Sequence, residues 1–327
     1  MPLYAAPAWL PGGHAQTIWP ALVNKRLRFT APQYRRERWA TPDGDFIDLD
    51  WQAGAAGAPL LVLFHGLEGS SLSHYALAFA DWARSHAWHF VVPHFRGCSG
   101  ELNFAPRAYH SGDHEEIDWV LQRLRLGHTG QMFGVGVSLG GNALLRWAEE
   151  AGQAASRSVQ AIAAVCAPVD LTASGHAIGR GFNRQAYTRM FLRSLKPKAL
   201  RKLEQHPGLF DRNTMLAARN LYEFDDVVTA PLHGFRNTDD YWERASAKPQ
   251  LQRIRIPALV LNALNDPFVP ASSLPQAAAQ GPQALFQFTP HVSLCQPAHG
   301  GHVGFVAGPW PGHTRALPEL VMGWFAG

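Results

Sequence analysis

The stretch that decides the fold is Gln131–Trp147, with the sequence QMFGVGVSLGGNALLRW. At its centre, Ser138 lies in a Gly-x-Ser-x-Gly pattern between a short apolar segment and an amphipathic segment with helical spacing. A serine on a tight strand-to-helix turn has a strained backbone, and small residues two positions away on either side prevent a clash. The following helix points its N-terminal N–H groups at the serine, where negative charge develops during attack on a carbonyl. The stretch therefore predicts a strand, a nucleophile elbow and a helix.

This motif needs support from the rest of the chain, because glycine is common in it. The chain has 30 Gly among 327 residues, and at that composition the pattern arises by chance in roughly one chain in ten. A nucleophilic serine also requires a base, an orienting acid and donors for the oxyanion. The motif becomes a specific signal only where those residues follow in the expected order.

Composition indicates a globular protein with a substantial core. The chain is 46% hydrophobic and 17% charged, and it contains no apolar run of the roughly 18 residues that cross a bilayer. The first residues do not have the pattern of a secretory signal. Three widely spaced cysteines favour a reducing compartment over a disulfide framework, so we expect a cytoplasmic protein. A net charge of +4 without an aromatic and basic strip argues against nucleic-acid binding.

Strands and helices are expected to alternate along most of the chain. Residues 1–30 are expected to lie across the surface, and the turn signal at 41–44 separates two strands. Further strand-like segments occur at 60–64, 88–92, 132–135, 161–166, 256–261 and 285–288. Helical segments occur at 75–85, from about 112, after the serine, at 274–279 and at 311–325. We therefore predict a single α/β domain over residues 1–327, with a mostly parallel sheet flanked by helices.

Residues 171–245 interrupt this alternation, since they contain helical patches and no clear strand, and we predict that they form an inserted, mainly helical cap. Residues 171–203 include no acid, while their basic residues are Arg180, Arg184, Arg189, Arg193, Lys196, Lys198, Arg201 and Lys202. This charge suggests weak peripheral association with an anionic membrane or an acidic substrate. The alternative is a solvated helix face balanced by nearby acids, namely Asp211, Glu223, Asp225 and Asp226.

The acid is expected to be Asp266, which comes soon after an apolar strand segment. A carboxylate at the carboxyl end of a strand faces the crevice in which open α/β sheets bind ligands. Asp170, at the end of the segment CAPVD, is the alternative acid. A purely structural role for Asp266, opening a turn before Pro267, is the other interpretation.

The base is expected to be His302, in a loop whose flanking glycines allow a close approach to the serine. His299 and His291 are alternatives, since the chain has 16 histidines. The spacing of His299 and His302 would suit a metal, but no carboxylate or cysteine accompanies the pair in the sequence. We expect neither a metal nor another cofactor.

Two backbone N–H groups are expected to form an oxyanion hole. Leu139 supplies one because it follows the serine, and Leu67 supplies the other because it follows His65 and Gly66 after a strand segment. With these donors, the order of serine, aspartate and histidine along the chain is that of an α/β-hydrolase fold.

Several stretches together resemble the α/β-hydrolase superfamily and, within it, the YheT-like esterases of bacteria and the related ABHD-type (AB hydrolase-4) proteins. The stretches are GGHAQTIWP at 12–20, LFHGLEG at 63–69, FRGCSGELN at 95–103, YHSGD at 109–113, GVSLGGN at 136–142, FDDVVTAPLHGF at 224–235, NDPFVP at 265–270 and HGGHVGF at 299–305. They span nearly the whole chain, and the cap is the least matched part.

The resemblance implies a role for each matching residue. It makes Ser138 the nucleophile, Asp266 the acid and His302 the base. It also implies that His14, Gln16, Arg96 and His110 line or brace the site. His65 and Gly66, which precede the expected donor Leu67, are further candidates to contact the substrate or support the site.

The residues and the resemblance together predict a serine carboxylic-ester hydrolase that forms an acyl-enzyme on Ser138. Short- to medium-chain acyl esters or acylglycerol-like lipids are the expected substrates. A thioesterase, lactonase or acyltransferase with the same three residues is an alternative, as is a non-catalytic scaffold that binds a small molecule or a protein. The sequence indicates no particular oligomeric state.

Overall fold

A central sheet organises the protein, whose computed structural model describes residues 4–24, 32–276 and 285–327. Within these residues the sheet has nine strands in the order β1-β2-β4-β3-β5-β6-β7-β9-β8. The strands are β1 (Arg35–Ala40), β2 (Phe46–Gln52), β3 (Leu60–Phe64), β4 (His89–Pro93), β5 (Met132–Val137), β6 (Ala161–Val165), β7 (Ala258–Leu261), β8 (Leu285–Gln287) and β9 (Val292–Cys295). The six strands from β4 to β9 in this order are parallel, while β1, β2 and β8 pair antiparallel at the two edges. The mostly parallel sheet that the sequence predicts is therefore confirmed.

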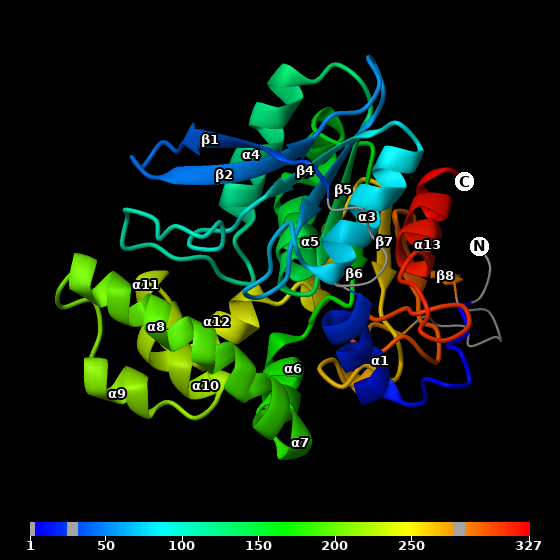
Figure 1. The fold of residues 1–327 in the computed structure, drawn as a ribbon. Helices are drawn as coiled ribbons and strands as arrows, with labels where there is room; N and C mark the ends of the chain where they lie inside the picture. Colours follow the sequence, from blue (N-terminus) through cyan, green and yellow to red (C-terminus); the bar gives the residue numbers. More distant parts are fainter. Residues whose placement is uncertain (1–3, 25–31, 277–284) are drawn as a thin grey trace.

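Helices cover both faces of this sheet (Figure 1). Those outside the region 171–245 are α1 (Gly13–Trp19), α3 (His74–Ser85), α4 (His114–Gly127), α5 (Leu139–Ala151) and α13 (Ala316–Phe325), with short π- or 3₁₀-helical turns at Pro20–Asn24, Gly152–Arg157, Lys248–Arg253 and Ala271–Ser273. Apolar side chains of α4 and α5 pack on one face, and those of α3 and α13 pack on the other.

Strand β3 shows why the sequence forms a central strand. Leu60, Val62 and Phe64 belong to the core under α4 and α5, whereas Leu61 and Leu63 belong to the core under α3 and α13. All five are at most 2% exposed. Burying each such side chain contributes about 1.5–3 kcal/mol, and a continuous apolar run is what a strand covered on both faces requires.

Residues 171–245, called the cap below, lie between β6 and β7 and are all described. They contain helices and no strand, with α6 (Leu171–Ile178), α7 (Gly181–Asn183), α8 (Arg189–Gln205), α9 (Arg212–Ala217), α10 (Leu221–Phe224), α11 (Ala230–Leu232), α12 (Thr238–Ala245) and π-helical turns at Arg184–Thr188 and Asp225–Thr229. Most of these helices gather in a separate layer off one end of the sheet (Figure 1). Because they follow β6, they stand at the edge where the parallel strands end.

The structure corrects several predicted elements. Strand β9 was not predicted, although it lies between β7 and β8 in the sheet. Residues 13–19 form a helix where a surface segment with a polar turn is predicted, and Gln16 in it is only 1% exposed. The last helix begins at Ala316 and not near residue 311, because residues 307–313 form a loop closed by a β-bridge between Ala307 and His313. For the helix predicted at 274–279, residues 274–276 are not helical, and 277–279 lie outside the described residues.

Candidate active site

Ser138 stands on the sharp turn between β5 and α5, as the elbow motif predicts. Its backbone has φ 54° and ψ −120°, a conformation that a residue with a side chain rarely adopts. The turn is crowded: a Cβ added to Gly140 would lie 2.5 Å from the carbonyl oxygens of Phe64 and His65. A glycine at this position therefore lets the helix start directly behind the serine and against the neighbouring loop.

His302 joins the serine to the aspartate. Its Nε2 lies 2.9 Å from the Ser138 hydroxyl oxygen, and its Nδ1 lies 2.8 Å from a carboxylate oxygen of Asp266. The carboxylate accepts the Nδ1 proton, which leaves Nε2 as the acceptor for the serine hydroxyl. The second carboxylate oxygen of Asp266 accepts the N–H of Phe268 at 2.7 Å. The three residues thus have the geometry of a nucleophile, a base and an orienting acid.

The alternative acids and bases lie elsewhere. Asp170 caps the N-terminus of α6, where it accepts the Ala173 N–H at 3.0 Å, and it pairs with Lys248. His299 is exposed, and its Nδ1 lies 3.5 Å from the side-chain nitrogen of Asn265. Neither residue shares a hydrogen bond with Ser138 or His302 in the described part of the chain.

The loop after β3 leaves one backbone donor open beside the serine. Gly66 donates its N–H to the Tyr75 hydroxyl, and Glu68 donates its N–H to the Tyr109 hydroxyl, both at 2.9 Å. Between them, the Leu67 N–H has no acceptor among the described residues. The first N–H of α5, from Leu139, has none either. A Cβ on Gly66 would lie 3.1 Å from Cβ of Ser138, so the loop runs directly past the nucleophile. Leu67 and Leu139 therefore stand where an oxyanion hole is expected.

The N-terminal helix α1 holds the loop of His302. The side-chain oxygen of Gln16 accepts the Gly300 N–H and the Asn265 side-chain amide, both at 2.9 Å. Thr17 accepts the backbone N–H of His302 itself at 2.8 Å. Gln16 therefore braces the site and does not line the cavity beside the serine. Thr17 was not singled out from the sequence, although the neighbouring motif GGHAQTIWP includes it.

His14 and His65 are also bracing residues. His14 bonds the Tyr187 hydroxyl at 3.1 Å, and the Tyr187 ring packs on Phe268, whose ring centre is 4.2 Å from that of His302. His65 is fully buried, where Nδ1 bonds the Gly66 carbonyl at 2.8 Å and Nε2 accepts the Phe95 N–H at 3.1 Å.

Arg96 and His110 line the cavity beside Ser138 but differ in character. The Arg96 guanidinium donates hydrogen bonds to three carboxylates: Glu116 at 2.6 Å, Asp43 at 2.8 Å and Asp45 at 3.0 Å. Burial lowers the pKa of His110 to about 3, so the ring is neutral at physiological pH.

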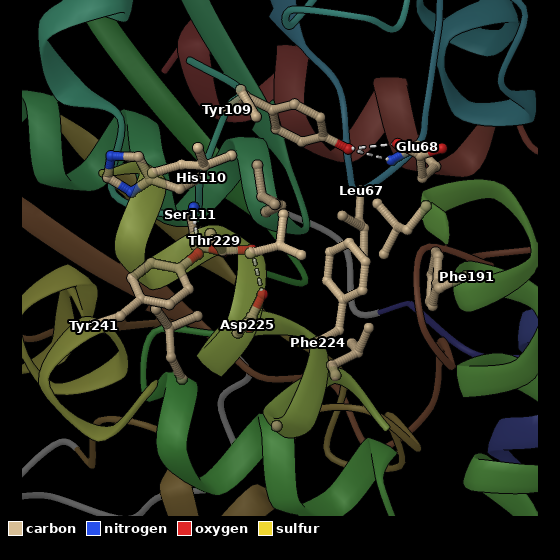
Figure 2. A pocket seen from close by; sticks show the side chains of 18 of the residues that line it. Leu67, Glu68, Tyr109, His110, Ser111, Phe191, Phe224, Asp225, Thr229 and Tyr241 are labelled. Carbon is tan, nitrogen blue, oxygen red and sulfur yellow. Dashed lines mark hydrogen bonds between the residues drawn. The ribbon is translucent and has the colours of Figure 1, made fainter. Parts of the chain in front are cut away.

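A cap lysine reaches the loop that carries Leu67. Lys198 of α8 donates to the Glu68 carboxylate at 2.9 Å. The Tyr109 hydroxyl donates to the same carboxylate at 3.0 Å while it accepts the Glu68 N–H (Figure 2). Glu68 has a backbone φ of 55°, and these three bonds hold it in that uncommon conformation. Sequence reasoning missed this contact because Glu68 and Lys198 are 130 residues apart.

A cavity of about 190 Å³ opens above the serine, between the cap and the ends of the strands. Ser138, Leu139, Leu67 and His302 form its floor, and most of its wall comes from cap side chains. The larger apolar residues in that wall include Phe191, Leu195, Phe210, Leu221, Phe224 and Phe268. The cavity can therefore take an apolar group next to the nucleophile.

Cys166 is the remaining reactive group near the acid and base. It is buried, its sulfur accepts the Val303 N–H at 3.3 Å, and potential ligand atoms of Cys166, Asp266 and His302 lie within 4.8 Å of one another. Burial raises the pKa of the Cys166 thiol well above its usual value, which disfavours the thiolate that a metal needs. Both ring nitrogens of His302 are already hydrogen-bonded. These three residues therefore do not suit a metal ion.

The sequence from 59 to 309 matches the family described as the alpha/beta hydrolase fold. The chain therefore belongs to this family, and the predicted fold class and enzyme class are both confirmed at that level.

Two relatives and one solved structure define the likeness further. YheT of Escherichia coli (strain K12), whose name contains the word esterase, is 41% identical over 302 residues, which cover 90% of this chain and 84% of YheT. Phospholipase ABHD3 of Mus musculus is 28% identical over 317 residues, 94% of this chain and 74% of that protein. The esterase Pf2001 of Pyrococcus furiosus shares the fold, with a TM-score of 0.51, 13% identity and 90% of each chain covered. The predicted membership among YheT-like and ABHD-type proteins is thus confirmed.

Among the described helices, none is long and apolar enough to cross a membrane.

Proposed function

We propose that the protein is a serine carboxylic-ester hydrolase that works through an acyl-enzyme on Ser138. The observation that carries the proposal is the position of His302, which hydrogen-bonds both the Ser138 hydroxyl and the Asp266 carboxylate. The names of YheT and ABHD3, an esterase and a phospholipase, support the same reaction class.

Each residue then has a defined task. His302 removes the proton of Ser138 as the serine oxygen attacks the ester carbonyl, and Asp266 stabilises the imidazolium that forms. The N–H groups of Leu67 and Leu139 bind the oxyanion of the tetrahedral intermediate. His302 then protonates the leaving alcohol, which leaves an acyl group on Ser138. Water, activated by the same histidine, attacks the acyl-enzyme and releases the carboxylic acid.

The cavity favours short- to medium-chain acyl groups. Because an apolar cavity of roughly 150 Å³ holds a benzene molecule, one of about 190 Å³ that must also hold the alcohol suits a short- to medium-chain acyl group. A thioesterase, lactonase or acyltransferase would use the same residues, and comparing octanoate esters, thioesters and lactones separates these reactions. A non-catalytic scaffold would need neither the His302 hydrogen bonds nor two open N–H groups beside Ser138.

The first test is covalent labelling of the folded protein by a fluorophosphonate, which reacts with activated serines. We expect labelling of the wild-type protein and none of Ser138→Ala. Ester hydrolysis should fall at least about 10⁴-fold in Ser138→Ala and about 10⁴-fold in Asp266→Asn. Asp170→Asn is the matched control, and its activity should stay within about threefold of the wild type, since Asp170 caps α6 and pairs with Lys248 but bonds neither Ser138 nor His302. Wild-type activity in Ser138→Ala would reject the proposal, and a larger loss in Asp170→Asn would reassign the acid.

A further inference from the structure

The cavity above Ser138 has a polar wall that the proposed reaction does not use. It is built by two motifs from separate parts of the sequence, YHSGD at 109–113 and FDDVVTAPLHGF at 224–235. Figure 2 shows polar side chains of both motifs around one side of the cavity, namely His110, Ser111, Asp225 and Thr229, with Phe191 and Phe224 toward the other side. The cavity therefore offers two different surfaces to a bound molecule.

Direct contacts fix the two motifs to each other. The ring centres of His110 and His233 are 4.5 Å apart, and those of His110 and Phe235 are 5.5 Å apart. Tyr241 of α12, which lies outside both motifs, accepts the Ser111 N–H at 2.8 Å. The Tyr241 ring packs against His110 at 5.7 Å. The polar wall is thus a built surface that joins the cap to the core.

Asp225 is the charged group in this wall. Its side chain lies among the cavity-lining residues, where one oxygen accepts the Thr229 hydroxyl at 2.6 Å and the other accepts the Trp242 indole N–H at 3.0 Å. These bonds hold the carboxylate in one orientation (Figure 2 shows the bond to Thr229). Each carboxylate oxygen keeps a further acceptor position.

No structural partner accounts for the charge of Asp225. Both donors, the Thr229 hydroxyl and the Trp242 indole N–H, are neutral. The side-chain oxygen of an asparagine at this position would accept at least one of these hydrogen bonds equally well. No ion pair connects Asp225 to a lysine, arginine or histidine in the part of the chain that the structure describes. Burial raises the pKa of Asp225 to about 6, so the group is still largely ionised at neutral pH. A carboxylate that lines a cavity without an ion-pair partner costs free energy, because burial removes part of its water. A ligand that donates a hydrogen bond to it recovers part of that cost.

We propose that this polar wall binds the alcohol part of the ester, and that Asp225 accepts a hydroxyl or binds an ammonium group of that alcohol. The proposal rests on the ester hydrolysis proposed above. The apolar side of the cavity, with Phe191 and Phe224, suits the acyl chain, which carries no donor. The alcohol is the part of an ester that can carry hydroxyl or ammonium groups, and Ser138 lies in the same cavity, where the ester bond must be placed.

The test compares three octanoate esters that share the acyl chain. Monooctanoylglycerol carries free hydroxyls, octanoylcholine carries a positive charge, and propyl octanoate carries neither. We measure kcat/KM for each with the wild-type protein, with Asp225→Asn and with the control Asp226→Asn. Asp226 is the exposed neighbouring acid, and its carboxylate accepts the Thr238 N–H within the cap.

The wild-type protein should prefer monooctanoylglycerol or octanoylcholine over propyl octanoate, and the preferred ester identifies the group that Asp225 binds. Asp225→Asn should lower that preference ratio at least tenfold, mainly through KM, while Asp226→Asn should keep it. Damage to folding lowers all rates together and leaves the ratio unchanged, so an unchanged ratio in Asp225→Asn overturns the proposal. Absence of preference in the wild-type protein also overturns it. If no ester is cleaved and Ser138 is not labelled, the proposed function itself fails.

Discussion

Ser138, His302 and Asp266 meet because each stands just beyond a strand of the same parallel sheet. Ser138 and Asp266 could be predicted because each follows an apolar segment and parallel strands end at a common edge. His302 was predicted from the glycines around it, although the strand that precedes it, β9, was not. Gln16 and Thr17 could not be predicted in the same way. Their partners Gly300 and His302 are 284 and 285 residues further along the chain, and a local pattern contains no information about such contacts.

His65 allows a test of the buried residues around the oxyanion loop. It must stay neutral in the folded protein, because Nδ1 donates to the Gly66 carbonyl and Nε2 accepts the Phe95 N–H. Burial and the nearby His94 lower the pKa of His65 to about 3. The unfolded chain, with an ordinary histidine pKa near about 6.5, therefore binds one more proton than the folded protein between these two values. The contribution of His65 to stability is present above pH 6.5 and is lost as the pH falls toward 3.

We expect His65→Gln to be less stable than the wild type at pH 7 and to lose this disadvantage in acid. The difference in unfolding free energy should shrink by about 1.4 kcal/mol per pH unit between pH 6 and 4. Urea unfolding at several pH values measures it. Two parallel stability curves would show that His65 takes up its proton equally in both states.

Among the helices and strands, each described strand except β9 was predicted from the sequence. β3 has five consecutive apolar residues, whereas β9 has only Val292–Cys295, interrupted by a serine. Helix α1 was missed because its seven residues include a glycine, a histidine and a glutamine, and its stability comes from packing against the loop of His302. The helical nature of the cap follows from its sequence, but the contact of α8 with the loop after β3 does not.

That contact predicts a positioning role for Lys198. Through Glu68, Lys198 orients the loop that carries the Leu67 N–H. A donor to the oxyanion acts mainly in the transition state. Lys198→Met should therefore lower kcat about tenfold with little change in KM, and Lys198→Arg should restore most of the loss. Steady-state kinetics on octanoate esters gives both constants.

Lys196→Met is the control for this experiment, because Lys196 lies on the same helix but bonds only the cap carbonyls of Leu216 and Ala218. Its kcat should stay close to that of the wild type. Equal losses in the two methionine variants would mean that the lysines support only the cap, and the positioning role would be rejected.

In the whole molecule, the basic residues of the cap fall into two groups. Some bond groups inside the protein, and others are exposed. Lys196, Lys198 and Lys202 bond groups inside the protein. Among residues 171–203, the exposed basic residues are Arg180, Arg189, Arg193 and Arg201, and Phe182 and Met190 beside them are 56% and 55% exposed. The predicted association with an anionic membrane stays a prediction, and these residues are the surface on which it depends.

Each exposed arginine near an anionic surface contributes about 1 kcal/mol of attraction. We therefore expect the protein to sediment with phosphatidylglycerol vesicles at low salt, to remain in solution with phosphatidylcholine vesicles, and to be released by high salt. Arg189→Gln combined with Arg193→Gln should weaken binding, while Arg35→Gln on β1, which lies outside the cap, should not. Binding that ignores salt, or no binding at all, would contradict the prediction.

The hydrogen bonds between α1 and the loop of His302 can form only after most of the chain between them has been synthesised. Translation completes α1 before the loop of His302, because Gly300, which bonds Gln16, follows Gln16 by 284 residues. During that interval the buried amide of Gln16 and the hydroxyl of Thr17 have no partner in the loop that they later hold. Much of the sheet can therefore form in the nascent chain before His302 is in place beside Ser138. Activity should appear only after the loop of His302 has been synthesised and has bound α1, which a time course of translation measures.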